Sequence, residues 1–128
     1  MTSEEFVAAL VQVVHEASVT DVIKSLQAPS GRRSDGQQLA LMNWFNRISE
    51  EDRQRVRQAV ERAVHSAIFG TLCVLDGVRA IEDGPAKSEL RLLAVNGSTT
   101  EWLNSPNAEC LHDIYQGHVY ERVFGRKG

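Results

Sequence analysis

Residues 65–84 read HSAIFGTLCVLDGVRAIEDG, the most apolar stretch of the chain and the one that decides the fold. The helix that contains this stretch starts at Ser49, a good capping residue. The Glu-Glu-Asp run that follows interacts favourably with the positive end of the helix dipole. No clear stop signal precedes Gly84 and Pro85. The sequence therefore predicts one central helix over residues 50–82.

A helix of that length is longer than the diameter of a compact domain of this size. At about 1.5 Å per residue it would measure about 50 Å. A compact domain of 128 residues is only about 35–40 Å across. We therefore expect that the helix breaks at Gly70 or Gly77, that its polar first turns protrude, or that it spans a dimer.

Small residues form a stripe along this helix at alternating spacings of four and three: Ala59, Ala63, Ser66, Gly70, Cys73, Gly77 and Ala80. The bulkier face carries Val60, Val64, Ile68, Leu72, Leu75 and Val78. Glycine inside a helix costs about 1 kcal/mol relative to alanine, so the stripe indicates the close approach of another group. Two partners are open. One is an aromatic side chain of the same chain, such as Trp44, Phe45 or Trp102. The other is a second copy of the chain, docked as a homodimer through Ala63, Ser66, Gly70, Cys73 and Gly77.

Further helices flank the central one. Residues 2–17 and 18–27 predict two separate amphipathic helices, the first with Phe6, Leu10, Val13, Val14 and Ala17 on its inner face. A loop is expected over 28–36, followed by a helix over 37–48 whose inner side carries Leu41, Trp44, Phe45 and Ile48. Near the C-terminus, Ser105 and Pro106 predict the start of a last helix that buries Leu111, Ile114 and Tyr115 and that ends or bends at Gly117.

A change of hydrophobic period predicts one β-hairpin. Residues 88–95 and 98–104 flank Asn96-Gly97, the favoured residue pair for a two-residue turn in which both positions have positive φ. The fold class is therefore α+β and mostly α-helical. A long buried central helix is packed by N- and C-terminal helices, with one hairpin near residues 88–104. We expect a single domain with one core over 1–128. It divides into an N-terminal helical segment and loop (1–35), a core (36–116) and a C-terminal tail (117–128).

Composition excludes several classes of function. The apolar fraction is 42%, the charged fraction is 24% and the net charge is −3, as in an ordinary soluble globular protein without a cationic surface for nucleic acid. The longest charge-free run, residues 63–75, is shorter than the roughly 20 residues that a membrane span needs. The acidic N-terminus does not resemble a signal peptide. We therefore expect a cytoplasmic protein, without nucleic-acid or membrane partners, in which Cys73 and Cys110 are reduced.

Polar side chains at the end of the central helix are the best candidates for a site. His65, Asp76 and Arg79 lie within about 40° on a helical wheel. A functional interpretation makes Asp76 a base and Arg79 the group that binds an anion. The structural interpretation, which we favour, pairs Asp76 with Arg79 to tether the helix end to a loop.

His112 and Asp113 are the other candidates. As neighbours on a helix they point about 100° apart, so we do not expect them to form a dyad with each other. If the last helix packs on the central one, His112 can approach Asp76 and give a histidine–carboxylate pair suited to acid–base work. Neither HxxxH nor CxxC spacing is present, so no metal and no cofactor is expected. A packing role for His112 is favoured over catalysis.

The phrases FGTLCVLDGVRAIEDG and NSPNAECLHDIY, with the hairpin between them, resemble a group of small bacterial proteins of unknown function. In that group a helix ending in a similar LDGVRAIED phrase precedes a short hairpin and an LHD helix. The resemblance covers roughly residues 40–116 and implies the domain but no activity. In general style the chain also resembles bacterial immunity proteins.

Taken together, these features favour a non-enzymatic bacterial interaction module, such as an immunity or adaptor protein, with a protein partner. Residues 98–104 are a candidate edge for a partner strand. Two alternatives stay open. One is a small enzyme or ligand-binding domain built on Asp76, Arg79 and His112, with His65 and Asp113 as further binding candidates. The other is a structural homodimer.

Overall fold

The fold is described from a computed structural model, which describes residues 1–28 and 35–125. Most of the expected 28–36 loop and the last three residues of the expected tail lie outside this range. Along the chain the elements are α1 (Ser3–Leu10), the π-helical segment η1 (Val11–Glu16), α2 (Ala17–Gln27), α3 (Gly36–Arg47), α4 (Glu50–Leu75), β1 (Leu93–Asn96), β2 (Thr99–Trp102) and α5 (Leu111–Phe124). The predicted class, α+β and mostly helical with one hairpin, is confirmed.

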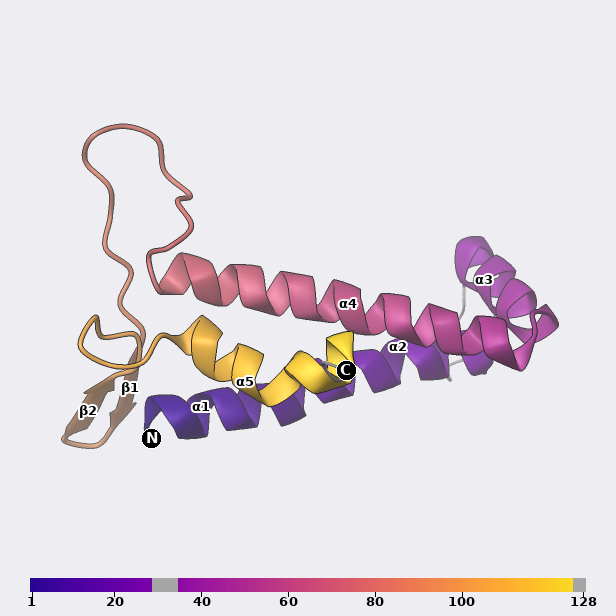
Figure 1. Ribbon diagram of the computed structural model, residues 1–128, viewed down its shortest axis with the longest axis horizontal. Coiled ribbons are helices and arrows are strands. Elements are labelled where there is room, and N and C mark those ends of the chain that lie inside the picture. The colour runs from indigo at the N-terminus through magenta and orange to yellow at the C-terminus, as the bar shows by residue number, and fades with distance from the viewer. Residues whose placement is uncertain (29–34, 126–128) are drawn as a thin grey trace.

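The helices form an elongated bundle (Figure 1). The long helix α4 lies along one side, and α5 with the continuous α1–η1–α2 helix lies along the other. At one end α3 crosses the bundle. At the other end the hairpin and the long loop between α4 and β1 project away from the helices. The candidate polar residues lie at this second end, where α4 stops and α5 starts.

The N-terminal helix is continuous from Ser3 to Gln27, so the prediction of two separate helices is wrong. Five of its buried residues follow at intervals of four, namely Val7, Val11, His15, Val19 and Ile23, and Leu26 is buried three residues later. In a regular α-helix that spacing drifts by about 40° per step. The wider π-helical turn, with i to i+5 hydrogen bonds, takes up an extra residue and keeps these side chains on one face. The expected inner face is correct in part: Phe6 and Leu10 pack against the core, whereas Val13 is 69% exposed.

By length and composition alone, the N-terminal helix is apolar enough to cross a membrane. The search for a long charge-free run did not detect this helix, because Glu16 and Asp21 interrupt the run. In the structure this helix packs against α3, α4 and α5 through its buried face.

Helix α3 confirms part of the expected inner side. Phe45 is buried and packs against α2, and Ile48 packs against the same cluster, whereas the buried Met42 was not expected. Leu41 and Trp44 are both 43% exposed, so their expected inner position is wrong.

The start of α4 agrees with the sequence, because the Ser49 side chain accepts a hydrogen bond from the Asp52 backbone N–H.

Helix α4 ends at Leu75, so the predicted extension to residue 82 and the stop at Gly84-Pro85 are wrong. Gly77 has φ of +77°, a conformation that favours glycine. The Gly77 N–H donates to the Val74 carbonyl, and the Val78 N–H donates to that of Cys73. These two bonds are the Schellman motif that satisfies the last carbonyls of a helix. The break at Gly77 was one of the two expected positions. It shortens α4 to 26 residues, about 39 Å, which fits the bundle.

At Gly70 the stripe of small residues is contacted by Arg79 rather than by an aromatic ring. A Cβ at Gly70 would overlap the Nη1 atom of Arg79, whose guanidinium occupies that space. Gly70 and Cys73 are buried, whereas Ala59, Ala63 and Ser66 are exposed. The homodimer through this stripe stays a prediction, which the molar mass in solution tests. The bulkier face does contact the cores, except for Val78, which lies beyond the helix end and is exposed.

The hairpin is present, but its turn is shifted by one residue. Asn96 pairs with Thr99, so the turn residues are Gly97 and Ser98 rather than Asn96 and Gly97. Gly97 has φ of +60°, and a glycine at the first central position is typical of a type II′ turn. Asn96 keeps its strand conformation because only one positive φ is then required. The strand before the turn begins at Leu93, five residues later than expected.

Helix α5 starts later than expected and continues further. Residues 105–110 form a turn, in which Ser105 Oγ accepts from the Asn107 N–H, and the helix begins at Leu111. It passes through Gly117 and ends at Phe124. Val119 and Val123 are buried in the core, so residues 117–124 are not a tail. The expected burial of Leu111, Ile114 and Tyr115 is confirmed.

The interior holds two apolar clusters rather than the single expected core. The first joins α1, the end of α4 and α5, with Val7, Leu72 and Tyr115 among its members. The second joins α2, α3 and the first half of α4, around Val19 and Phe45. His15, which is fully buried, lies on the N-terminal helix between the residues of the two clusters.

Candidate functional site

Asp76 is the C-terminal capping residue of α4, and its carboxylate points at the start of α5. Oδ1 accepts a hydrogen bond from the Leu111 backbone N–H at 3.1 Å, and Oδ2 accepts one from the His112 N–H at 2.8 Å. The first N–H groups of a helix have no partner within the helix. Asp76 therefore supplies the N-terminal cap of α5 from another helix, and its charge is favourable at the positive end of the helix dipole.

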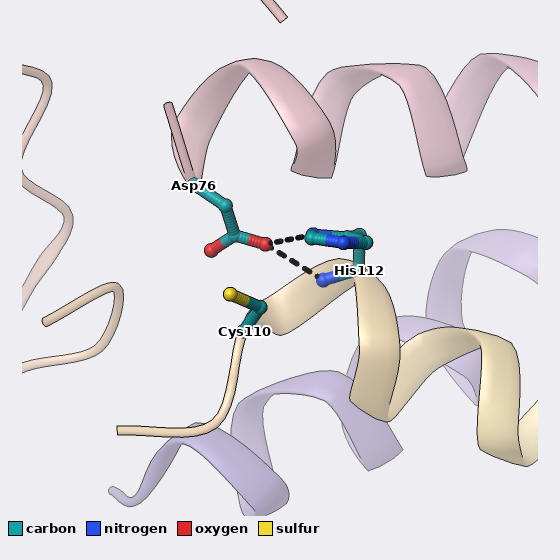
Figure 2. A group of neighbouring side chains, drawn as sticks. All are labelled: Asp76, Cys110 and His112. Atoms are coloured by element: carbon teal, nitrogen blue, oxygen red, sulfur yellow. Dashed lines mark hydrogen bonds and ion pairs between the residues drawn. The ribbon is translucent and has the colours of Figure 1, made fainter. Parts of the chain in front are cut away.

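His112 lies against the same carboxylate. Its Nδ1 is 2.6 Å from Asp76 Oδ2 (Figure 2). Because an ionised carboxylate only accepts hydrogen bonds, Nδ1 carries the proton in this contact. The histidine–carboxylate contact that the sequence left open is therefore present, whereas any role in acid–base chemistry stays a prediction.

Asp113 approaches the other nitrogen of the same ring. Its Oδ1 is 3.4 Å from His112 Nε2, an ion-pair contact that the sequence did not predict. Their Cα–Cβ bonds diverge as expected, but the Asp113 side chain reaches the far side of the imidazole. His112 therefore has a carboxylate at each ring nitrogen. The Asp76 side chain is almost completely buried and that of Asp113 is exposed.

Arg79 does not pair with Asp76 among the residues that the structure describes, so the favoured Asp76–Arg79 tether is wrong. The reason is the end of α4. Once the chain leaves the helix at Gly77, Arg79 is no longer one helical turn from Asp76. Its side chain instead turns back over Gly70. Asp76 does join the end of α4 to another segment, but that segment is the start of α5.

His65 is separate from this group. Its ring stacks on Phe69 and Tyr115, meets Phe124 edge-on and forms a 2.7 Å hydrogen bond with Gln116 Oε1. The helical wheel gives only the direction around the axis, and Asp76 lies about 16 Å further along the axis than His65. His65 is therefore a packing residue of the α4–α5 interface.

Cys110 completes a cluster that the sequence did not predict. Asp76, Cys110 and His112 each offer one ligand atom, and these atoms lie within 4.8 Å of one another. Burial raises the pKa of the Cys110 thiol, and the Asp76 and Asp113 carboxylates raise it further. Cys110 is the N-cap residue of α5, yet its side chain makes no capping hydrogen bond, because Asp76 has taken that position. A local search for metal motifs misses this cluster because Asp76 lies 36 residues before His112.

A cavity of about 330 Å³ adjoins the cluster. Asp76 and Arg79 line it from the end of α4, the loop contributes Ile81 and Lys87, and Trp102 contributes from the hairpin. Of the three cluster residues, Asp76 is the one that lines this cavity.

Asn104 holds the base of the long loop and was not singled out from the sequence. Its Oδ1 accepts from the Leu92 N–H and the Trp102 Nε1–H, both at 2.8 Å. Its Nδ2 donates to the carbonyls of Leu75 and Leu90. One buried amide thus uses its whole hydrogen-bonding capacity to join the end of α4, both ends of the hairpin and the residues before β1.

A second buried polar group was also missed. His15 Nδ1 is 2.6 Å from the Tyr115 hydroxyl, and His15 Nε2 is 2.8 Å from Glu61 Oε2. Burial raises the pKa of the Tyr115 hydroxyl, and the nearby Glu61 carboxylate raises it further. The only local signal was a histidine at the four-residue spacing of the buried valines. The group joins the N-terminal helix, α4 and α5 between the two apolar clusters.

No protein-family model matches this chain, and neither a curated protein nor a solved structure matches it. The resemblance to small bacterial proteins of unknown function therefore stays a prediction.

Proposed function

We propose that this chain is a non-enzymatic protein–protein interaction module, of the adaptor or immunity kind, that binds its partner through residues 78–95. The observation that carries the proposal is that five exposed large apolar side chains follow one another along this projecting segment: Val78, Ile81, Leu90, Leu93 and Val95. Ile81 and Val95 are each about two-thirds exposed, at 67% and 65%. Isolated exposed apolar residues are ordinary, but a group of them on one projecting segment is typical of an interaction site.

The loop between α4 and β1 is longer than ordinary connections, and such loops are often functional. Asn104 fastens its base. Further out, the Glu82 carboxylate accepts hydrogen bonds from the Ser88 N–H and hydroxyl, which closes the loop on itself. A loop that is already held loses less conformational entropy when a partner binds, so its apolar contacts contribute more to affinity.

The cavity beside the loop offers an anchoring point. Ile81, Leu90 and Trp102 line its apolar part. A buried anchor side chain in such a pocket typically dominates the energy of an interface. The hairpin adds a second mode of binding. Its sheet has two strands, so β2 has β1 on only one side and its other edge can accept an extended partner segment.

The proposal is tested by capture at defined positions. A photocrosslinking amino acid replaces Ile81 in one variant and Val13 in another, and both are expressed in cells of the source organism. Val13 is equally exposed, at 69%, but lies on the N-terminal helix. We expect one protein to be captured at Ile81 and not at Val13.

The captured protein is then purified and titrated. Ile81→Asp should weaken its binding at least about tenfold, equivalent to about 1.4 kcal/mol, and Val13→Asp should leave it unchanged. Equal capture at the two positions, or unchanged affinity of Ile81→Asp, would reject the interface. Capture of a second copy of this chain would replace the adaptor proposal with the homodimer.

A second candidate function, a small ligand-binding domain or enzyme, is supported by the Asp76–His112 contact beside the cavity. Arg79 also lines the cavity and is free of Asp76 for an anionic ligand, as far as the described residues show. Binding of small carboxylates or phosphates that is lost in Arg79→Ala, while the melting temperature is kept, would favour this candidate over the interaction module.

A further inference from the structure

We propose that Asp76, Cys110 and His112 form a binding site for a divalent transition metal of the zinc class. This proposal goes beyond the interaction function and does not depend on it. The three side chains offer one oxygen, one sulfur and one nitrogen within 4.8 Å of one another. Magnesium and calcium prefer oxygen ligands alone, whereas zinc accepts thiolate, imidazole and carboxylate together.

The spacing of the ligand atoms fits a small cation after modest shifts. Zinc lies about 2.0–2.3 Å from such ligands, so the ligand atoms of a tetrahedral site are about 3.3–3.8 Å apart. His112 Nδ1 and Asp76 Oδ2 are closer than that, at 2.6 Å, because they share a proton. The widest separation in the cluster does not exceed 4.8 Å. Side-chain movements of about 1 Å therefore convert the hydrogen-bonded cluster into a three-ligand site.

The proton balance of metal entry is simple. The cation takes the place of the proton between His112 Nδ1 and Asp76, and that proton moves to Nε2, so the imidazole stays neutral. The Cys110 thiol releases its proton to solvent and binds as the thiolate. One proton is therefore released for each cation bound, as is usual when a thiol becomes a ligand.

The surroundings of the ligands are those of a supported site. When Nδ1 binds the metal, the Nε2–H faces Asp113 Oδ1, which is 3.4 Å away. Metal-bound histidines usually donate their other N–H to a carboxylate or carbonyl in this way. Asp76 is held in place by the backbone N–H groups of Leu111 and His112, so its orientation is fixed before any cation enters.

The cavity beside Asp76 and the fourth ligand position of the metal also fit this proposal. Asp76 is one of the residues that line the cavity of about 330 Å³. Three protein ligands leave the fourth tetrahedral position for water, as in catalytic rather than purely structural zinc sites.

The test uses the full chain without an affinity tag, first freed of metal with a chelator. Cobalt(II) is the probe, because thiolate ligation gives an intense charge-transfer absorption and tetrahedral coordination gives strong visible bands. We expect one equivalent of cobalt to bind with both signals, and zinc to displace it. The two cysteines of the chain supply a matched pair of variants. Cys110→Ser should abolish the charge-transfer band, and Cys73→Ser should keep it.

A second pair of variants tests the histidine. His112→Gln should weaken cobalt binding at least tenfold, whereas His118→Gln, which alters a histidine near the surface paired with Glu4, should leave it unchanged. Asp113→Asn should weaken binding about tenfold, as expected for the loss of a carboxylate that supports a ligand. Circular dichroism of each variant checks that the fold is retained.

A measurement on the unaltered chain covers the case in which Cys110→Ser fails to fold. Zinc should slow the alkylation of Cys110 at least tenfold, measured by peptide mass spectrometry, and should not change that of Cys73. The absence of a charge-transfer band in the wild-type chain, its persistence in Cys110→Ser, or equal alkylation of Cys110 with and without zinc would each overturn the proposal.

Discussion

The guanidinium of Arg79 lies over Gly70, in the space that a Cβ at this position would fill. Glycine in the interior of α4 therefore has a specific use. It lets the side chain that follows the helix end fold back against the helix. The contact also explains why Arg79 and Asp76 do not meet, although their spacing in the sequence suits a pair.

A double-mutant cycle tests this contact. Gly117 lies within α5 with open space around its Cβ position, so Gly117→Ala should raise the free energy of unfolding by about 1 kcal/mol through helix propensity. Gly70→Ala should raise the free energy of unfolding by less, because the new methyl group displaces the Arg79 guanidinium. In an Arg79→Ala background, Gly70→Ala should raise the free energy of unfolding by the full amount of about 1 kcal/mol. Denaturant unfolding measures all three, and an equal gain in both backgrounds would show that Arg79 does not pack on Gly70.

Asn104→Ala should be strongly destabilising. The substitution leaves the Leu92 N–H, the Trp102 Nε1–H and two backbone carbonyls without their partner. Unpaired buried groups cost about 1–3 kcal/mol each when water does not replace the bond, so a loss of at least about 2 kcal/mol is expected. Asn107→Ala, at an exposed position, is the control. Limited proteolysis should also cut the loop over residues 77–92 faster in Asn104→Ala, and unchanged cleavage would contradict its role in fastening that loop.

Asp76→Asn should lower stability by about 1–3 kcal/mol when measured in the presence of a chelator. The neutral amide has one acceptor oxygen where the carboxylate had two, and it loses the charge at the start of α5. Asp83→Asn, at an exposed position in the loop, should change stability little. A melting temperature unchanged by Asp76→Asn would show that α5 does not depend on this cap.

Tyr115 makes stability depend on alkaline pH. Its pKa is raised from the ordinary value of 10.0, first by burial and then by Glu61. The unfolded chain therefore releases this proton before the folded chain does. Below about pH 10 the group has no effect on pH dependence, and above it the free energy of unfolding should fall as pH rises.

Tyr115→Phe should make that alkaline fall less steep, whereas Tyr120→Phe, which removes the other tyrosine of the chain, should not. At neutral pH, Tyr115→Phe should also cost about 1–3 kcal/mol, because buried His15 Nδ1 loses its partner. Unfolding curves at a series of pH values measure both effects. Parallel pH profiles for the two variants would contradict the assignment to Tyr115.

The features that could be predicted from the sequence are those that depend on nearby residues. Ser49 and the acids after it determine a helix start within one turn, and the structure has that start. The fold class also followed from local periodicity. The cap of α5 is different in kind, because its acceptor, Asp76, lies 35 residues before Leu111 and belongs to another helix. The start of α5 was therefore predicted at Ser105, where the local pattern was better.

The site residues follow the same division. The approach of His112 to Asp76 was left open because it depends on how two helices pack, which no spacing determines. The prediction placed Arg79 on a helix that in fact ends at Leu75, so its partner was predicted wrongly. His15 lies in an apolar run, and only a turn of irregular width brings it inward with the valines.

The π-helical segment sets the direction in which residues after it point relative to residues before it. Residues before it, such as Val7, belong to one apolar cluster, and residues after it, such as Val19, belong to the other. In a regular α-helix the four-residue spacing would turn the second set of residues away from the first by about 40° per step. The wide turn at Val11–Glu16 removes this drift, so one face of the helix serves both clusters. Removal of one residue within this segment would turn one half of the helix by about 100° against its cluster.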